Sequence, residues 1–160
     1  MSHDLYTEQK GLSYEEALFE AQRCLNCRHK PCMEGCIAHN DIPAMIMAFI
    51  EGKGEEAKAI SESKTSFPEI CGRVCYQEMQ CEAVCVRMKQ NAPVKIGLIE
   101  RFIGDHYQSN AKIHAKTQYK VAIVGSGPAS LACAQYLLEK GVFVELFEKS
   151  SKLGENPTQF

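Results

Sequence analysis

The chain has 160 residues and a net charge of -2, which is enough length for one ordinary domain or two small ones. This charge gives no long-range electrostatic reason to expect nucleic acid as a partner. No apolar stretch approaches the roughly 20 residues that a membrane span needs, so we expect no membrane partner either. The first twenty residues are acidic where a secretory signal is basic, which predicts a cytoplasmic protein.

The N-terminal two thirds of the chain shows helical patterns. Ser13 stands three residues before Glu16, which is the pattern of a capping box and predicts a helix that ends near the first cysteine. Asp41 predicts the cap of another helix, and the apolar sequence that follows is broken into two short helices around Gly52. Residues 94–108 predict a further helix with one apolar stripe. This stripe consists of Ile96, Ile99, Phe102 and Ile103.

Eight of the nine cysteines form two compact quartets. Residues 24–36 have the spacing C-x2-C-x4-C-x3-C, and residues 71–85 have the spacing C-x3-C-x5-C-x3-C. In a reducing cytoplasm such thiols are better explained as metal ligands than as disulfides. Zinc commonly uses paired knuckles separated by a loop, whereas iron-sulfur clusters often use compact runs whose last cysteine serves the other cluster. The spacing favours iron-sulfur clusters, and a zinc-bound structural or interaction module is the alternative.

A βαβ pattern follows in the C-terminal part of the chain. Residues 119–124 and 141–149 predict two strands, and residues 131–140 predict the helix between them. The turn GSGPAS offers glycines for a tight turn and backbone amides for a pyrophosphate at the helix N-terminus, and an acidic residue ends the second strand where it can bind ribose hydroxyls. The candidate nucleotide-binding residues are Gly125, Gly127, Pro128, Ala129, Ser130 and Glu148.

The shift in composition predicts three segments. They are a helical iron-sulfur domain at 1–110, a linker at 111–118, and the truncated N-terminal part of a Rossmann-type FAD-binding domain at 119–160. One βαβ unit leaves its second strand at an open edge, so we expect the remainder of the flavin domain as a partner. Cys133, on the predicted helix, is expected to be a small buried hydrophobe.

The order of these features points to a known family. With both quartets, the stretches PEICGRVC and PVKIGLIERF and the glycine turn in this order, the sequence resembles the small (beta) subunit of NADPH-dependent glutamate synthase. It is also similar to the N-terminal part of dihydropyrimidine dehydrogenase and to the large subunit of NADH-dependent ferredoxin:NADP oxidoreductase. The resemblance runs from about Ser13 to about Leu153. It implies an α-helical ferredoxin-like domain with two 4Fe-4S clusters, followed by an FAD domain and an NAD(P)H domain.

The resemblance also implies the iron ligands. One cluster would be held by Cys24, Cys27, Cys32 and Cys85. The other would be held by Cys36, Cys75, Cys81 and, as a non-cysteine ligand, Glu100. Cys71 would then bind no iron, whereas the spacing alone selects Cys71 as the eighth ligand. The two assignments of this position conflict.

The function implied by the resemblance is electron transfer. A hydride passes from NAD(P)H to FAD in such enzymes, and electrons continue singly through the clusters to a larger catalytic or electron-accepting subunit. The chain would be part of an NAD(P)H-dependent oxidoreductase of the glutamate synthase type. With one βαβ unit it would not be catalytically complete, and no residue is assigned a catalytic role. An inactive fragment of the oxidoreductase is a further alternative.

Overall fold

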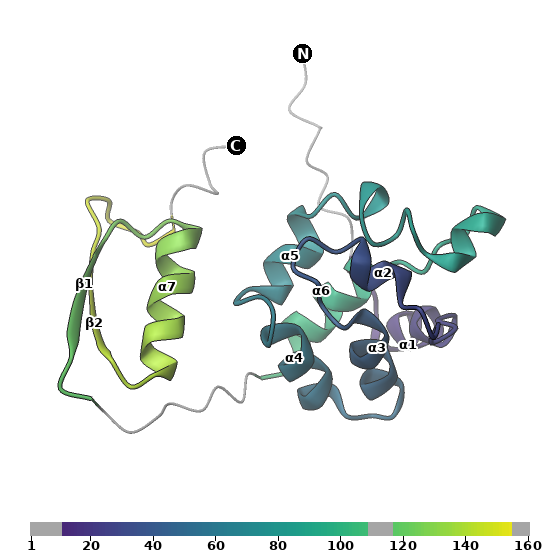
Figure 1. Ribbon diagram of the computed structural model, residues 1–160, viewed down its shortest axis with the longest axis horizontal. Coiled ribbons are helices and arrows are strands. Elements are labelled where there is room, and N and C mark those ends of the chain that lie inside the picture. The colour runs from purple at the N-terminus through teal and green to yellow at the C-terminus, as the bar shows by residue number, and fades with distance from the viewer. Residues whose placement is uncertain (1–10, 109–116, 155–160) are drawn as a thin grey trace, which may run out of the picture. The chain divides into compact units, whose positions relative to one another are not determined.

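The computed structural model describes residues 11–108 and 117–154, which form two separate compact units (Figure 1). The predicted linker lies almost entirely outside the described residues, so the predicted domain boundaries stay predictions. The N-terminal unit is helical, and the C-terminal unit consists of two parallel strands and one helix. Within the described residues, no helix is both long and apolar enough to cross a membrane.

Two helices of the N-terminal unit, α1 and α3, begin at side-chain caps. Ser13 Oγ accepts from the backbone N of Glu16 at 3.2 Å, and Glu16 Oε2 accepts from the backbone N of Ser13 at 2.8 Å. Asp41 Oδ1 accepts from the backbone N of Ala44 at 3.2 Å. Both predicted helix starts are therefore confirmed. The helices are α1 (Tyr14–Gln22), α2 (Pro31–Glu34), α3 (Ile42–Ile50), α4 (Gly54–Glu62), α5 (Pro68–Val74) and α6 (Ile96–His106), with short 3-10 helices at Gln77–Met79 and Val86–Gln90.

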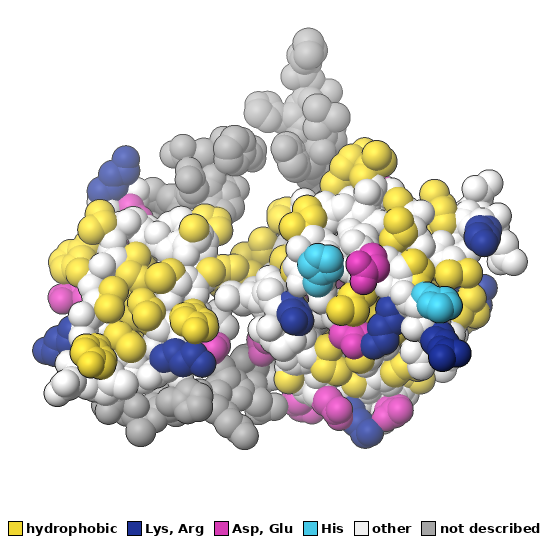
Figure 2. Space-filling view, viewed as in Figure 1, with side chains coloured by type: hydrophobic (Ala, Val, Ile, Leu, Met, Phe, Trp, Pro, Cys, Tyr) yellow, Lys and Arg dark blue, Asp and Glu magenta, His cyan; other side chains and the backbone are white. Residues whose placement is uncertain are grey.

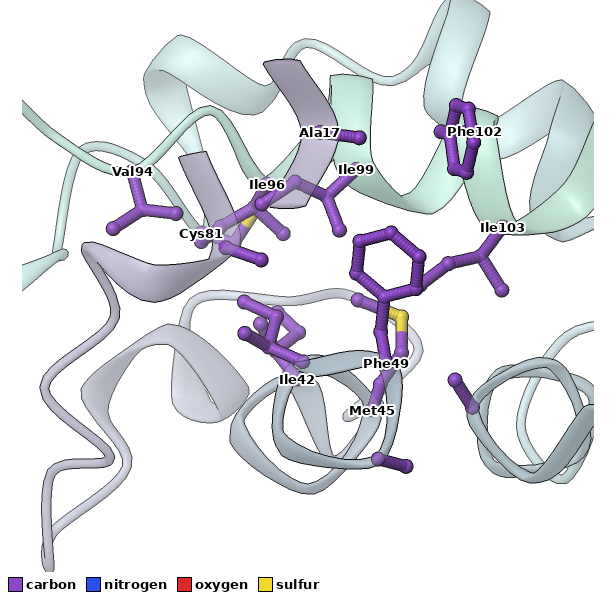
Figure 3. Packing of buried hydrophobic residues seen from close by; sticks show 14 residues of the cluster. Ala17, Ile42, Met45, Phe49, Cys81, Val94, Ile96, Ile99, Phe102 and Ile103 are labelled. Carbon is purple, nitrogen blue, oxygen red and sulfur yellow. The ribbon is translucent and has the colours of Figure 1, made fainter. Parts of the chain in front are cut away.

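An apolar core joins α1, α3 and α6 (Figure 3). The ring of Phe49 is fully buried and projects from α3 toward Ile99 and Ile103 of α6 (Figure 3). Its centroid lies 5.9 Å from that of Tyr14 and 5.6 Å from that of Phe102. The predicted apolar stripe of α6 is buried along its whole length. Because burying one large apolar side chain stabilises a fold by about 1.5–3 kcal/mol, this core is what holds α6 in place.

Helices α5 and α6 approach each other closely at a glycine. A Cβ atom on Gly72 would lie 2.6 Å from the backbone N of Arg101, which is closer than real Cβ contacts. Only the absence of a side chain at this position permits the crossing. It lays the middle of α6, which carries Glu100, against the end of α5, which Cys75 follows directly.

Two polar contacts tie the second half of α6 to its neighbours. The Arg73 guanidinium of α5 donates to both carboxylate oxygens of Asp105, at 2.9 and 2.8 Å, and this contact lowers the pKa of Asp105. Lys58 of α4 is buried and donates to the backbone O of Gly104 at 2.8 Å. This bond satisfies a carbonyl in the last turn of α6, where no helical partner remains.

The C-terminal unit contains β1 (Lys120–Val124), α7 (Pro128–Glu139) and β2 (Phe143–Phe147). The strands are parallel, with Lys120 opposite Phe143 and Val124 opposite Phe147. The predicted βαβ pattern is thus confirmed. Apolar side chains cover much of the visible face of this unit (Figure 2), and several are exposed. The exposed large apolar residues here are Tyr119, Val124, Tyr136, Leu138, Phe143, Phe147 and Leu153.

The prediction that Cys133 is buried is wrong. Its side chain is exposed on α7, and no residue of this helix is fully buried. The physical reason is the small size of the described unit, in which one helix and two strands offer too little surface to enclose a side chain.

We predict that Gly72→Ala destabilises the N-terminal unit. The added methyl group must push the backbones of α5 and α6 apart, so the free energy of unfolding should fall by about 1–3 kcal/mol. Urea denaturation monitored by circular dichroism measures this change. Gly11→Ala is the matched control, because its Cβ would lie 3.8 Å from Arg101 Nε in ordinary contact. Equal stability of the two variants would contradict the close crossing.

Candidate metal centres and nucleotide-binding turn

Four cysteines from both quartets line one pocket. They are Cys24, Cys27, Cys32 and Cys85. Cys24 follows Arg23, the C-cap of α1, and its backbone N donates to the carbonyl of Ala21 at 2.9 Å. The other walls are mostly apolar and include Ile42, Ile46 and Val94. Four thiols around one apolar pocket match the ligand set of a 4Fe-4S cluster, so the residues fit such a group.

Burial shapes the acidity of these thiols. It is the first cause that raises the pKa of Cys24, and the neighbouring Cys27 and Cys85 raise this pKa further. Burial also raises the pKa of Cys32 to about 11, with Cys24 and Cys85 as the next causes. A metal must therefore displace protons from these sulfurs, which makes its binding pH-dependent.

A fixed cation stands at the same pocket. Arg87 lines it, lowers the pKa of Cys24, and donates through Nε to the backbone O of Arg23. The Arg23 guanidinium in turn donates to Glu20 Oε1 at 2.5 Å and to the backbone O of Ala92 at 2.5 Å. Glu20 Oε1 also accepts from the backbone N of Lys95 at 2.8 Å. This network anchors the positive charge beside the first thiol set.

A second group of acidic side chains gathers around Cys81. Burial raises the pKa of Cys81 to about 12, and the charges of Glu82, Cys36 and Glu100 raise it further. Glu82 has a separate task, because its Oε1 accepts from the backbone N of Gly97 at 3.1 Å in the first turn of α6. Cys36 and Glu100 are thus electrostatic neighbours of Cys81, although they come from distant parts of the sequence.

Cys75 joins this group, and Cys71 lies at its edge. Burial raises the pKa of Cys75 to about 11, followed by Cys71, then Glu100 and Cys36. Cys71 Sγ lies 3.4 Å from Thr65 Oγ1, within hydrogen-bonding distance. The charge of Glu100 therefore raises the pKa of both Cys75 and Cys81, and Cys71 raises that of Cys75. Cys36, Cys75, Cys81 and Glu100 are called the second set below, because they are electrostatic neighbours.

Glu100 is a partly buried carboxylate on α6. Burial raises its pKa to about 7, and a hydrogen bond from Asn40 acts in the opposite direction. Asn40 Nδ2 donates to Glu100 Oε1 at 3.3 Å. The flanking Ile99 and Ile103 are fully buried, so the helix face that carries them also holds the carboxylate near the core.

The two quartets meet at Gly35. A Cβ atom there would lie 2.6 Å from Val84 Cγ2 and 2.9 Å from the backbone O of Gln80. This packing places Cys36, the last cysteine of the first quartet, near Cys81 of the second quartet, while Cys85 lies in the first pocket.

Across residues 11–108 and 117–154, no three His, Cys, Asp or Glu side chains are arranged to hold a single metal ion.

The glycine turn lies between β1 and α7. Gly125 has a positive φ of 89°, which a side chain would disfavour. Gly127 is the N-cap of α7, and Pro128 begins the helix, followed by Ala129 and Ser130. Space around the turn is open, since a Cβ on Gly125 or Gly127 would meet no atom within 4 Å. Backbone amides at this helix start are available to a phosphate group.

Glu148 is anchored to the same turn. Its Oε2 accepts from the backbone N of Ser126 at 2.8 Å and from Ser126 Oγ at 2.5 Å, and its Oε1 accepts from the backbone N of Ser150 at 2.9 Å. These bonds, that of the Ser126 hydroxyl first, lower the pKa of Glu148 to about 2. The structure therefore brings the predicted nucleotide-binding residues together and adds Ser126, which is buried.

Ser126 and Asn40 are not among the residues that the sequence predicts for the two sites. Ser126 occupies the variable position between the two glycines of the turn, where the motif itself demands no residue type. Asn40 stands directly before Asp41, which caps α3. Because asparagine is common next to helix starts, its presence there indicates no contact with a distant residue. Neither position carried a signal of its own.

Comparison with known proteins identifies the family. Residues 2–112 match the family described as dihydropyrimidine dehydrogenase domain II, 4Fe-4S cluster. The chain belongs to this 4Fe-4S family. Residues 123–158 match the NAD(P)-binding Rossmann-like domain. An iron-sulfur domain followed by a nucleotide-binding domain fits an electron-transfer module. The 4Fe-4S description also favours iron-sulfur over the zinc alternative.

Individual relatives agree with this family. The chain is 38% identical over 144 residues to the glutamate synthase [NADPH] small chain of Escherichia coli. This match covers 87% of this chain and 30% of the relative. It is 34% identical over 148 residues to the same subunit of Azospirillum brasilense, with 89% and 31% covered. The NAD-dependent dihydropyrimidine dehydrogenase subunit PreT of Escherichia coli is 34% identical over 142 residues, with 86% and 34% covered. The chain thus spans about a third of these relatives' length.

We predict that Ser126→Ala raises the pKa of Glu148 from about 2 toward the ordinary value near 4.3, because the strongest of its hydrogen bonds is lost. The carboxyl ¹³C chemical shift of Glu148, followed by NMR across a pH titration, measures this value. Ser130→Ala in the same turn is the control and should leave the pKa of Glu148 where it was. An unchanged value in Ser126→Ala would refute the anchoring role of the hydroxyl.

Proposed function

We propose that this chain is the iron-sulfur electron-transfer module of a flavin-dependent NAD(P)H oxidoreductase, most like the glutamate synthase small subunit. The observation that carries the proposal is the pocket in which Cys24, Cys27 and Cys32 of the first quartet meet Cys85 of the second. The match to a 4Fe-4S family over residues 2–112 and to a nucleotide-binding family over residues 123–158 supports it.

Two clusters are proposed, each with its own ligand set. The pocket cysteines would hold the first cluster, and Cys36, Cys75, Cys81 and Glu100 would hold the second. When bound, each cluster supplies a site that takes up and releases one electron at a time. The residues of the chain would hold the first cluster between apolar side chains with the cation of Arg87 beside it, and the second beside the partly buried carboxylate of Glu100.

The C-terminal unit would contribute to an FAD site in the complete protein. A Cβ built on Gly127 would meet no atom within 4 Å, so the start of α7 has room for a pyrophosphate. Glu148, which follows β2 and is held at the same turn by Ser126, would bind the ribose hydroxyls. The remainder of the flavin domain, an NAD(P)H site and a larger electron-accepting subunit would complete the path. The names of two relatives, one a small chain and the other a subunit, support such a partner.

The first test is the metal content of protein purified without oxygen. We expect about eight irons and eight acid-labile sulfides per chain, as two 4Fe-4S clusters require. About two zincs without sulfide would instead indicate the zinc-bound module. A chain with neither metal would indicate an inactive fragment.

We predict that Glu100→Ala and Cys71→Ser separate the two candidates for the eighth ligand. Loss of Glu100 should reduce the iron content to about four per chain, because one cluster loses a ligand, whereas Cys71→Ser should keep about eight. Iron and sulfide analysis of both variants measures this. The reverse result would transfer the ligand role to Cys71.

We predict that Arg87→Met lowers the midpoint potential of the cluster in the first pocket. A nearby positive charge favours the reduced, more negative cluster, and methionine keeps much of the side chain's apolar bulk without this charge. A redox titration followed by electron paramagnetic resonance measures the potential. Lys89→Met, on the same exposed 3-10 helix, is the control and should leave it unchanged. Equal potentials in all three proteins would show that Arg87 does not act on the cluster.

A further inference from the structure

The buried side chain of Asn40 has one polar atom without a hydrogen-bond partner in the described part of the chain. It is 2% exposed, and its Oδ1 is buried with no hydrogen-bond partner among the described residues. Burying an amide oxygen without a hydrogen-bond partner destabilises a fold. An apolar side chain would avoid this cost. The reason for an asparagine must lie in the bonds made by its nitrogen.

The amide nitrogen of Asn40 serves two acceptors. Nδ2 donates to Glu100 Oε1 at 3.3 Å and to Ser61 Oγ at 3.4 Å. Ser61 Oγ gives its own hydrogen to Met45 Sδ at 2.9 Å, so toward Asn40 it acts as an acceptor. A reversed carboxamide would place Oδ1 against these two oxygens. The network therefore fixes the orientation in which the nitrogen faces Glu100.

The backbone of Asn40 is held by the segment that carries Cys36. The backbone N of His39 donates to the carbonyl of Cys36 at 2.9 Å, and His39 has a positive φ of 51° that turns the chain. The carbonyl of Asn40 then accepts from the backbone N of Ile42 at 2.8 Å, at the start of α3. Asn40 thus links the Cys36 turn to the Glu100 carboxylate on α6.

We propose that Asn40 is a positioning residue of the second site, which holds the Glu100 carboxylate toward Cys36, Cys75 and Cys81. A glutamate side chain has three rotatable bonds, so a buried donor at one oxygen selects one of its orientations. Hydrogen bonds from outside the ligand set also tune the electronic character of a ligand. This inference rests on the proposed function, since it takes the second set as a cluster site.

Asn40→Leu tests the role, because leucine has a similar size and no donor. Without the donor, the carboxylate gives more electron density to iron, so the midpoint potential of the second cluster should fall while that of the first stays constant. We expect about a tenfold change in the ratio of reduced to oxidised second cluster at a fixed potential, which corresponds to about 59 mV for one electron. Redox titration by electron paramagnetic resonance measures both clusters in the full chain, and Cys24→Ser identifies the signal of the first.

Ser61→Ala is the matched control. It removes the other acceptor of Asn40 in the same buried network and leaves the bond to Glu100, so a purely structural effect appears in both variants. The positioning role predicts a shifted second potential in Asn40→Leu alone. If the leucine variant does not fold, Asn40→Ser, whose shorter side chain does not reach Glu100, should give the same shift.

The possible results distinguish failure of the Asn40 role from failure of the proposed function. Unchanged potentials in Asn40→Leu or Asn40→Ser, or equal shifts of both clusters, overturn the role of Asn40 while the wild-type clusters still support electron transfer. A shift of the same size in Ser61→Ala also overturns it. Wild-type protein without iron and sulfide overturns the proposed function, and the inference about Asn40 falls with it.

Discussion

The close crossing of α5 and α6 is the constraint on which the second candidate site depends. Because Gly72 has no side chain, α6 lies against α5, and the glutamate in the middle of α6 reaches the thiols that follow α5. The apolar core behind α6 makes this position rigid, since Phe49 and the isoleucines of α6 are fully buried together. A carboxylate is thereby kept in a layer that raises its pKa to about 7 by burial.

The two candidate sites differ in charge. The first has four thiols and the anchored guanidinium of Arg87, whereas the second has three thiols and a carboxylate that receives a hydrogen bond from the neutral Asn40. In an apolar environment a unit charge acts more strongly than in water, so clusters with the same core would differ in electron affinity. The chain therefore distinguishes its two sites by what surrounds them as well as by their ligands.

Local signals in the sequence predicted much of the fold. The capping box at Ser13, the cap at Asp41, the stripe of α6 and the βαβ unit all follow from patterns within a few residues, and the structure confirms them. Helices α2 and α5 were not predicted, because with four and seven residues they are too short to show an apolar helical period. The contacts of Asn40 and the exposure of Cys133 depend on which distant residues pack nearby, and no local pattern contains this information.

The meeting of the quartets at Gly35 has a consequence for the order of assembly. Neither quartet contains a complete set of neighbouring thiols, since Cys85 lies in the pocket of the first and Cys36 lies with the second. With the proposed ligand sets, a growing or refolding chain would have to close the long loop between the quartets before any four-ligand site exists, and loop closure of this kind slows folding. Metal capture and the formation of long-range contacts would then be one cooperative event.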